Sequence, residues 1–180
     1  SEILNPAAEI SQQISLAGTE ASGTSNMKLM INGAITLGTL DGANVEIHEA
    51  VGSENMFLFG LRADEVEQLK REGYVPQRYI SHDPQMERCL NALRKGFRDG
   101  VSYEDLYQRL LYGADCPADQ YLLLADFASY CAASHRVVDT YADREKWNRM
   151  SLHNIARSGI FAADRAVAEY ADNIWDVPHR

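Results

Sequence analysis

Residues 18–28 read Gly18-Thr19-Glu20-Ala21-Ser22-Gly23-Thr24-Ser25-Asn26-Met27-Lys28, a run of small and polar residues that ends on a lysine. The apolar residues Leu29-Met30-Ile31 follow directly. A loop of this kind can surround an anion with backbone N–H groups and then enter a helix whose dipole favours negative charge. The run therefore predicts a phosphate-binding loop at the start of a helix.

Three common motifs with similar residues do not fit this loop. A nucleotide-binding P-loop needs lysine directly after its second glycine, whereas Thr24 follows Gly23. A serine-hydrolase elbow needs glycine where Glu20 stands, and no dinucleotide fingerprint follows a strand. Lys28, about one helical turn beyond the loop, suits a cofactor with a phosphate at one end and an aldehyde at the other. From the residues alone, an ordinary surface lysine remains the alternative.

The residues that follow the loop are typical of an α/β fold. The apolar runs 34–38 and 56–59 are bounded by glycine and predict buried strands. Between them, residues 41–52 predict a turn at Asp41-Gly42 and a short helix. We interpret that turn as structural and leave it out of the site, with a substrate-contacting loop as the alternative. Strand, helix and strand indicate a right-handed crossover in a parallel sheet. We expect residues 1–60 to hold these strands and the loop, and the sheet to be incomplete.

Residues 61–180 predict a mainly helical second half, and we expect the whole of 1–180 to form a single piece. Helices are predicted at 63–72, where Gly73 ends the pattern, at 84–97, with Pro84 in the first turn, and at 103–112. Further amphipathic helices follow over residues 127–141, 147–155 and 167–175. We expect Trp147 and Trp175 to be core anchors of these helices.

Composition excludes several classes of function. The chain has 17 basic and 26 acidic residues, a net charge of −9 and no basic run, so we expect no nucleic-acid partner. No membrane-spanning or signal-peptide pattern is present, which predicts a cytoplasmic protein without a membrane partner. The three cysteines form no C-x-x-C pair and are expected to be reduced and mostly buried. The five histidines share no ligand spacing, so we expect no metal site.

The string Thr-Glu-Ala-Ser-Gly-Thr-Ser-Asn-Met-Lys-Leu-Met-Ile-Asn-Gly, residues 19–33, resembles the pyridoxal-phosphate attachment motif of the α-glucan (glycogen, starch or maltodextrin) phosphorylases, E-A-S-G-T-[GS]-N-M-K. The likeness continues through residues 35–47 and 54–60 and returns in the closing helices, from Trp147 to Trp175. It therefore spans essentially the whole chain. One departure is Glu9, which stands where aspartate is usual in the family.

This resemblance implies a fold and a set of site residues. The fold would be α/β, part of the Rossmann-like C-terminal domain of the glycosyltransferase-B fold, with a helical C-terminal half. Because the motif follows Ser1 so closely, we expect a fragment of a longer protein. The family's roles, carried to matching positions, make Lys28 the catalytic, cofactor-bearing lysine. Gly23, Thr24, Ser25 and Asn26 would also bind pyridoxal 5'-phosphate, and Glu20, Ser22 and Gly23 would bind hydroxyls of the transferred glucosyl unit.

The resemblance also implies an activity. In the full-length enzyme, inorganic phosphate would cleave the terminal α-1,4 bond of a glucan and release α-glucose 1-phosphate with retention, the cofactor's phosphate relaying a proton. The family's remaining site residues lie upstream of this chain, so we expect the chain alone to be inactive. Two alternatives remain: a non-catalytic module that binds pyridoxal phosphate or another phosphate, and a folded fragment that self-associates, as a homodimer, through an exposed sheet edge.

Overall fold

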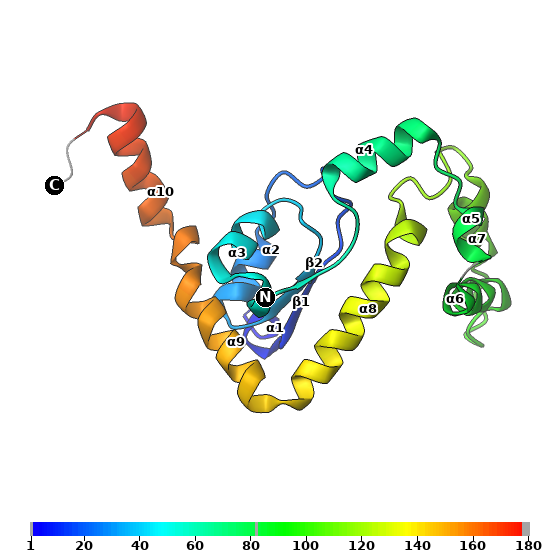
Figure 1. Cartoon of the computed structure of the whole chain (residues 1–180), viewed down its shortest axis with the longest axis horizontal. Coiled ribbons are helices and arrows are strands. Elements are labelled where there is room, and N and C mark those ends of the chain that lie inside the picture. The colour runs from blue at the N-terminus through cyan, green and yellow to red at the C-terminus, as the bar shows by residue number, and fades with distance from the viewer. Residues whose placement is uncertain (1, 82, 178–180) are drawn as a thin grey trace.

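The computed structural model describes residues 2–81 and 83–177 and contains a small parallel sheet with helices on both faces (Figure 1). The sheet order is β1 (Ile10–Gln13), β2 (Ile35–Gly38) and β3 (Phe57–Leu58). Ile10 pairs with Ile35, and Leu37 pairs with Phe57. The predicted strands and the parallel arrangement are confirmed. β1 was not predicted, because three of its four residues are polar.

A short helix, α1 (Leu4–Ala7), precedes β1. The strands are linked by α2 (Ser25–Ile31), between β1 and β2, and by α3 (Asn44–Val51) and the 3₁₀ turn η1 (Ser53–Asn55), between β2 and β3. All four residues of β2 are buried, because helices cover both of its faces. On one face, Met30 of α2 packs with Ile47 and Val51 of α3. This packing fixes the helix that follows the 18–24 loop against the sheet.

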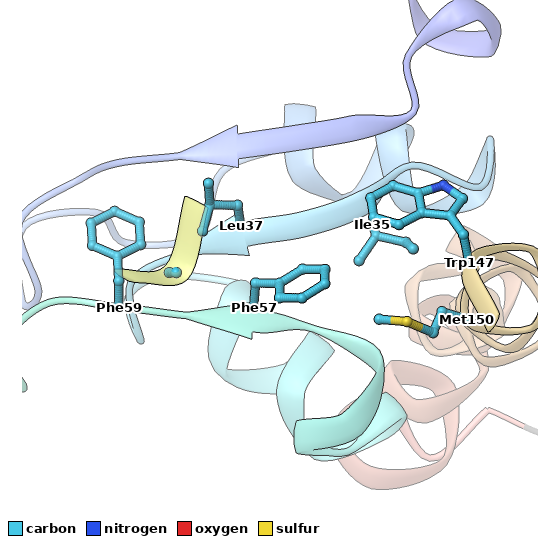
Figure 2. Close-up of a cluster of buried hydrophobic side chains, with 7 residues drawn as sticks. Ile35, Leu37, Phe57, Phe59, Trp147 and Met150 are labelled. Atoms are coloured by element: carbon cyan, nitrogen blue, oxygen red, sulfur yellow. The ribbon is translucent and has the colours of Figure 1, made fainter. Parts of the chain in front are cut away.

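The other face of the sheet packs against two long helices, α8 (Leu123–Ala142) and α9 (Arg144–Arg157). Figure 2 shows side chains of β2 and β3 directed toward Trp147 and Met150 of α9. Phe57 stacks on Trp147 with ring centroids 6.2 Å apart. The cluster consists of Ile35, Leu37, Phe57, Phe59, Ala133, Trp147 and Met150. Its position confirms Trp147 as a core anchor.

Four further helices lie near the start of α8 (Figure 1). They are α4 (Ala63–Glu72), α5 (Gln77–Ile80), α6 (Pro84–Lys95) and α7 (Glu104–Tyr112). The predicted bounds of α4 are confirmed, because Gly73 takes the left-handed conformation that ends a helix. Pro84 begins α6, and the Asp83 carboxylate accepts hydrogen bonds from the next two free N–H groups.

The chain ends in three short elements: the 3₁₀ turn η2 (Ser158–Phe161), α10 (Ala163–Tyr170) and the π-turn η3 (Ala171–Trp175). Phe161 of η2 packs against the cluster of Met30, Ile47 and Val51, and α10 then leads away from the sheet (Figure 1). Trp175 is 57% exposed, so the prediction that it anchors the core was wrong. Its amphipathic pattern is real, but in the described residues no helix lies against that face deeply enough to bury it. Likewise, Cys89 is exposed and the other two cysteines are only partly buried.

No helix in residues 2–81 and 83–177 has the length and apolarity needed to cross a membrane.

Candidate functional site

The run 18–28 folds as the sequence predicts, as a loop that enters a helix. α2 begins at Ser25, and the N–H of Lys28 donates to the carbonyl oxygen of Thr24 at 3.1 Å. Residues Met27 to Met30 are good helix formers, and Asn32-Gly33 ends the helix. Lys28 therefore lies one turn into α2. Its side chain is exposed at the surface of the described structure.

The turn before α2 presents free backbone donors. Within the described residues, no hydrogen bond is found to the N–H groups of Gly23, Thr24 or Ser25. Gly23 has φ +83°, a conformation that glycine adopts without strain. No protein acceptor within the described residues occupies these three adjacent N–H groups. They are therefore available to donate hydrogen bonds to the oxygens of a phosphate.

The buried side chain of Asn26 fixes the start of α2. Its Nδ2 donates to Asn44 Oδ1 at 3.0 Å. Its Oδ1 accepts from the N–H of Met27 at 2.9 Å. Asn44, also buried, donates in turn to the carbonyl oxygen of Thr39 at 3.0 Å. Both amides are thus satisfied in a chain of bonds that joins α2 to α3 and to the end of β2.

A second loop, residues 39–43, supports the first half of the run. Asp41 is 5% exposed, and its two carboxylate oxygens accept from the N–H of Gly18 at 2.8 Å and of Glu20 at 2.9 Å. The predicted turn is present, since the N–H of Asn44 donates to the Asp41 carbonyl oxygen. Interpreting Asp41-Gly42 as a turn alone was nevertheless incomplete.

The two loops approach each other closely at Gly42. The N–H of Ala43 donates to the carbonyl oxygen of Ser22 at 2.6 Å. A Cβ atom on Gly42 would lie 2.5 Å from that same oxygen, and Gly42 has φ +51°. Only glycine satisfies both conditions without strain. The 39–43 loop therefore packs directly against residues 18–22 and supports them.

The residues expected to contact a sugar lie along the outer side of this loop. Glu20 and Ser22 are exposed, and Gly23 is half-buried. The Ser22 hydroxyl makes one weak contact, with the Gly23 carbonyl oxygen at 3.3 Å. A carboxylate and a hydroxyl held in this way are available to hydroxyl groups of a ligand.

The shifted pKa values of the chain lie outside this site. Burial raises the pKa of the Asp126 carboxyl, which accepts from the N–H of Leu61 at 2.8 Å. Burial and the hydrogen bond to Asp119 raise the pKa of Tyr74. Asp119 also accepts from two N–H groups at the start of α8, so this group caps a helix. These shifts mark structural contacts rather than chemistry. No cluster of three or more possible metal ligands is found among the described residues.

Comparison with known proteins assigns this arrangement to a family. The sequence profile of the carbohydrate phosphorylases matches residues 1–177. The chain belongs to the carbohydrate phosphorylase family. This phosphorylase chain is 47% identical to a glycogen phosphorylase of Haemophilus influenzae over 98% of its own length. It is 46% identical to one of Synechocystis sp. and 43% identical to the human brain form, each over 96% of the chain. It spans about a fifth of the length of these curated relatives.

Sequence reasoning on the phosphorylase motif missed the residues beneath the loop. Asp41 and Asn44 are far from the run 18–28 in sequence, and only the fold brings them to it. A signal was present: Asp41, Gly42 and Asn44 lie within six residues after β2, a strand whose four residues are all buried. Polar residues at the carboxyl end of a central parallel strand commonly face a ligand site.

Proposed function

We propose that this phosphorylase chain is the cofactor-binding part of an α-glucan phosphorylase. The observation that carries the proposal is the row of unpaired N–H groups at Gly23, Thr24 and Ser25, one turn before Lys28, in a chain of this family. In this proposal the full-length protein adopts the glycosyltransferase-B fold, and residues 1–180 belong to its C-terminal domain as a single piece.

The described residues fit the phosphate end of pyridoxal 5'-phosphate. The N–H groups of Gly23, Thr24 and Ser25 would donate to its phosphate oxygens, and the exposed Thr24 hydroxyl would add a further donor. The buried acid Asp41 already accepts two backbone N–H bonds on the other half of the loop, so both of its oxygens have donors.

Lys28 would hold the aldehyde end of the cofactor, while Asn26 keeps its helix in place. Lys28 forms no ion pair in the described structure, and its side chain is exposed, so its amine is free to reach a ligand on the loop. When bound, the cofactor supplies a phosphate group that can exchange a proton with the substrate phosphate. The lysine's part is to anchor and orient.

Glu20 and Ser22 would meet the glucosyl unit on the outer side of the loop, together with the N–H of Gly23. A carboxylate accepts from sugar hydroxyls, and a serine hydroxyl can either donate or accept. In the full-length protein these contacts would hold the sugar while inorganic phosphate cleaves the terminal α-1,4 bond of a glucan. The product would be α-glucose 1-phosphate. The cytoplasmic location and the homodimer expected from the sequence stay predictions.

The test is phosphorolysis of glycogen, followed as α-glucose 1-phosphate release. We expect activity in the full-length protein, loss of at least about a thousandfold in Lys28→Ala, and little change in Lys70→Ala, which removes an exposed lysine of α4. The isolated 180-residue chain is expected to release none. Cofactor bound at Lys28 without any activity in the full-length protein would favour the non-catalytic module instead.

A further inference from the structure

We propose that Asp41 is the positioning residue for the sugar-contacting half of the 18–24 loop. Its carboxylate holds the backbone of Glu20 so that the Glu20 side chain meets the transferred glucosyl unit. It does not hold the phosphate cradle. This inference rests on the function proposed above and assigns a role to a residue outside the attachment motif.

The first support is the pair of hydrogen bonds that Asp41 accepts. They come from the N–H groups of Gly18 and Glu20, at 2.8 and 2.9 Å, and they bracket Thr19. Two bonds from one rigid carboxylate fix both the position and the tilt of the peptide between them. Because the Asp41 side chain is almost completely buried, water does not compete for these bonds.

The second support is the path of the Glu20 side chain. A Cβ atom built on Gly42 would lie 3.0 Å from Glu20 Cγ. The first methylenes of Glu20 therefore pass directly over the backbone beside Asp41, and its carboxylate extends beyond into solvent. Asp41 fixes where the side chain begins, and Gly42 leaves room for the direction it takes.

The third support is that the cradle is held by different residues. The Gly23–Ser25 turn is followed by Asn26, whose amide bonds to Asn44, and Ser22 is held by the N–H of Ala43. Neither contact involves the Asp41 carboxylate. The two halves of the loop thus have separate supports. We therefore expect a substitution at Asp41 to weaken sugar binding more than binding of the cofactor phosphate.

Asp41→Asn is the informative substitution. Asparagine has nearly the same shape, but it offers one acceptor where aspartate offers two, and its NH2 group would face one of the two N–H donors. Losing one charge-assisted bond that orients a substrate contact changes affinity by roughly tenfold. Asp119→Asn is the matched control, because Asp119 is also 5% exposed and also accepts two backbone N–H groups, those of Leu123 and Leu124, and none from residues 18–28.

The experiment is made in the full-length protein loaded with pyridoxal phosphate. In Asp41→Asn we expect the KM for α-glucose 1-phosphate to rise about tenfold, with an unchanged cofactor content per chain. Asp119→Asn should leave both unchanged. Loss of cofactor in Asp41→Asn, or equal effects of the two substitutions on KM, would overturn the inference. A wild-type protein that binds no cofactor at Lys28 would instead contradict the proposed function, and it would do so before any substitution is made.

A second measurement decides the case if Asp41→Asn is too unstable to assay. In the full-length protein before cofactor is added, the amide protons of Gly18 and Glu20 should exchange slowly with deuterated solvent, because each N–H donates to the buried Asp41 carboxylate. The amide protons of Gly23 and Thr24, which have no acceptor among the described residues, should exchange faster. Equal exchange of all four amides would overturn the separation proposed here.

Discussion

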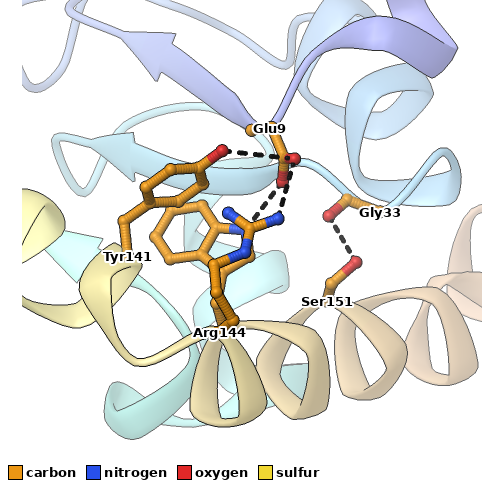
Figure 3. Close-up of polar contacts among 6 residues, drawn as sticks. Glu9, Gly33, Tyr141, Arg144 and Ser151 are labelled. Atoms are coloured by element: carbon orange, nitrogen blue, oxygen red, sulfur yellow. Dashed lines mark hydrogen bonds and ion pairs between the residues drawn. The ribbon is translucent and has the colours of Figure 1, made fainter.

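The indole N–H of Trp147 donates to the Glu9 carboxylate at 2.9 Å, joining the residue before β1 to helix α9. The same carboxylate accepts from Tyr141 and forms an ion pair with Arg144 at 3.3 Å (Figure 3). The Glu9 side chain therefore reaches three partners on two helices. A second contact nearby, from the Ser151 hydroxyl to the Gly33 carbonyl oxygen at 2.7 Å, ties α9 to the turn after α2.

Removing the Glu9 carboxylate should destabilise the chain. Trp147 is 1% exposed, so Glu9→Ala leaves a buried N–H without an acceptor, and we expect the free energy of unfolding to fall by about 1–3 kcal/mol. Glu145→Ala is the control, because it breaks an exposed ion pair with Arg149 on one helix and should change stability by less than about 0.5 kcal/mol. Urea unfolding followed by circular dichroism measures both. Equal losses in the two variants would contradict the assigned role of Glu9.

Gly42→Ala tests the contact between the two loops. The new methyl group would lie 2.5 Å from the Ser22 carbonyl oxygen, at a residue with φ +51°. Gly73→Ala carries a similar backbone strain at φ +88° but meets no atom within 4 Å. We expect a loss of about 1 kcal/mol in Gly73→Ala and a clearly larger one in Gly42→Ala, measured by thermal unfolding. The loops would not be in contact as described if the two variants were equally stable.

The free energy of unfolding should depend on pH through protonation of the Asp126 carboxyl. Burial raises the pKa of this carboxyl, the Leu61 N–H lowers it, and the charges of Asp119 and Glu65 raise it further. The net shift is upward, so the folded state favours the protonated form. The stabilisation from protonation is complete below the unfolded pKa of about 3.9 and is lost as the pH rises through the folded pKa.

Asp126→Asn removes that titration. The stability of the variant relative to wild type should therefore increase between pH 4 and pH 7. Urea midpoints of both proteins at several pH values give this difference directly. A difference that stays constant, or that shrinks as the pH rises, would show that Asp126 is not titrating as its surroundings require.

Much of the fold follows from local sequence. β2 and β3 are continuous apolar runs, which suits strands covered on both faces, and α4 ends where Gly73 permits a left-handed residue. β1 could not be predicted, because Ser11-Gln12-Gln13 has no apolar pattern and its strand form depends on pairing with β2. Trp175 was placed in the core wrongly, since an amphipathic helix shows which face is apolar but not whether anything covers it.

The candidate site divides in the same way. The run 18–28 was predicted as a loop followed by a helix, because its own small, polar and then apolar residues indicate that structure. The support from Asp41 and Asn44 was not predicted, because it depends on which loops the parallel sheet brings together at its carboxyl edge. A two-residue turn motif gives no indication of where its carboxylate is directed.

Covalent labelling decides whether Lys28 and the preceding turn form the pyridoxal-phosphate site. The 180-residue chain is incubated with pyridoxal phosphate, reduced with borohydride and mapped by peptide mass spectrometry, with Lys28→Arg as the control. Lys70, Lys95 and Lys146 are the competing lysines. We predict one adduct per chain, confined to Lys28 and absent from the control. Labels spread over all four lysines, or a wild-type pattern unchanged in Lys28→Arg, would contradict the account.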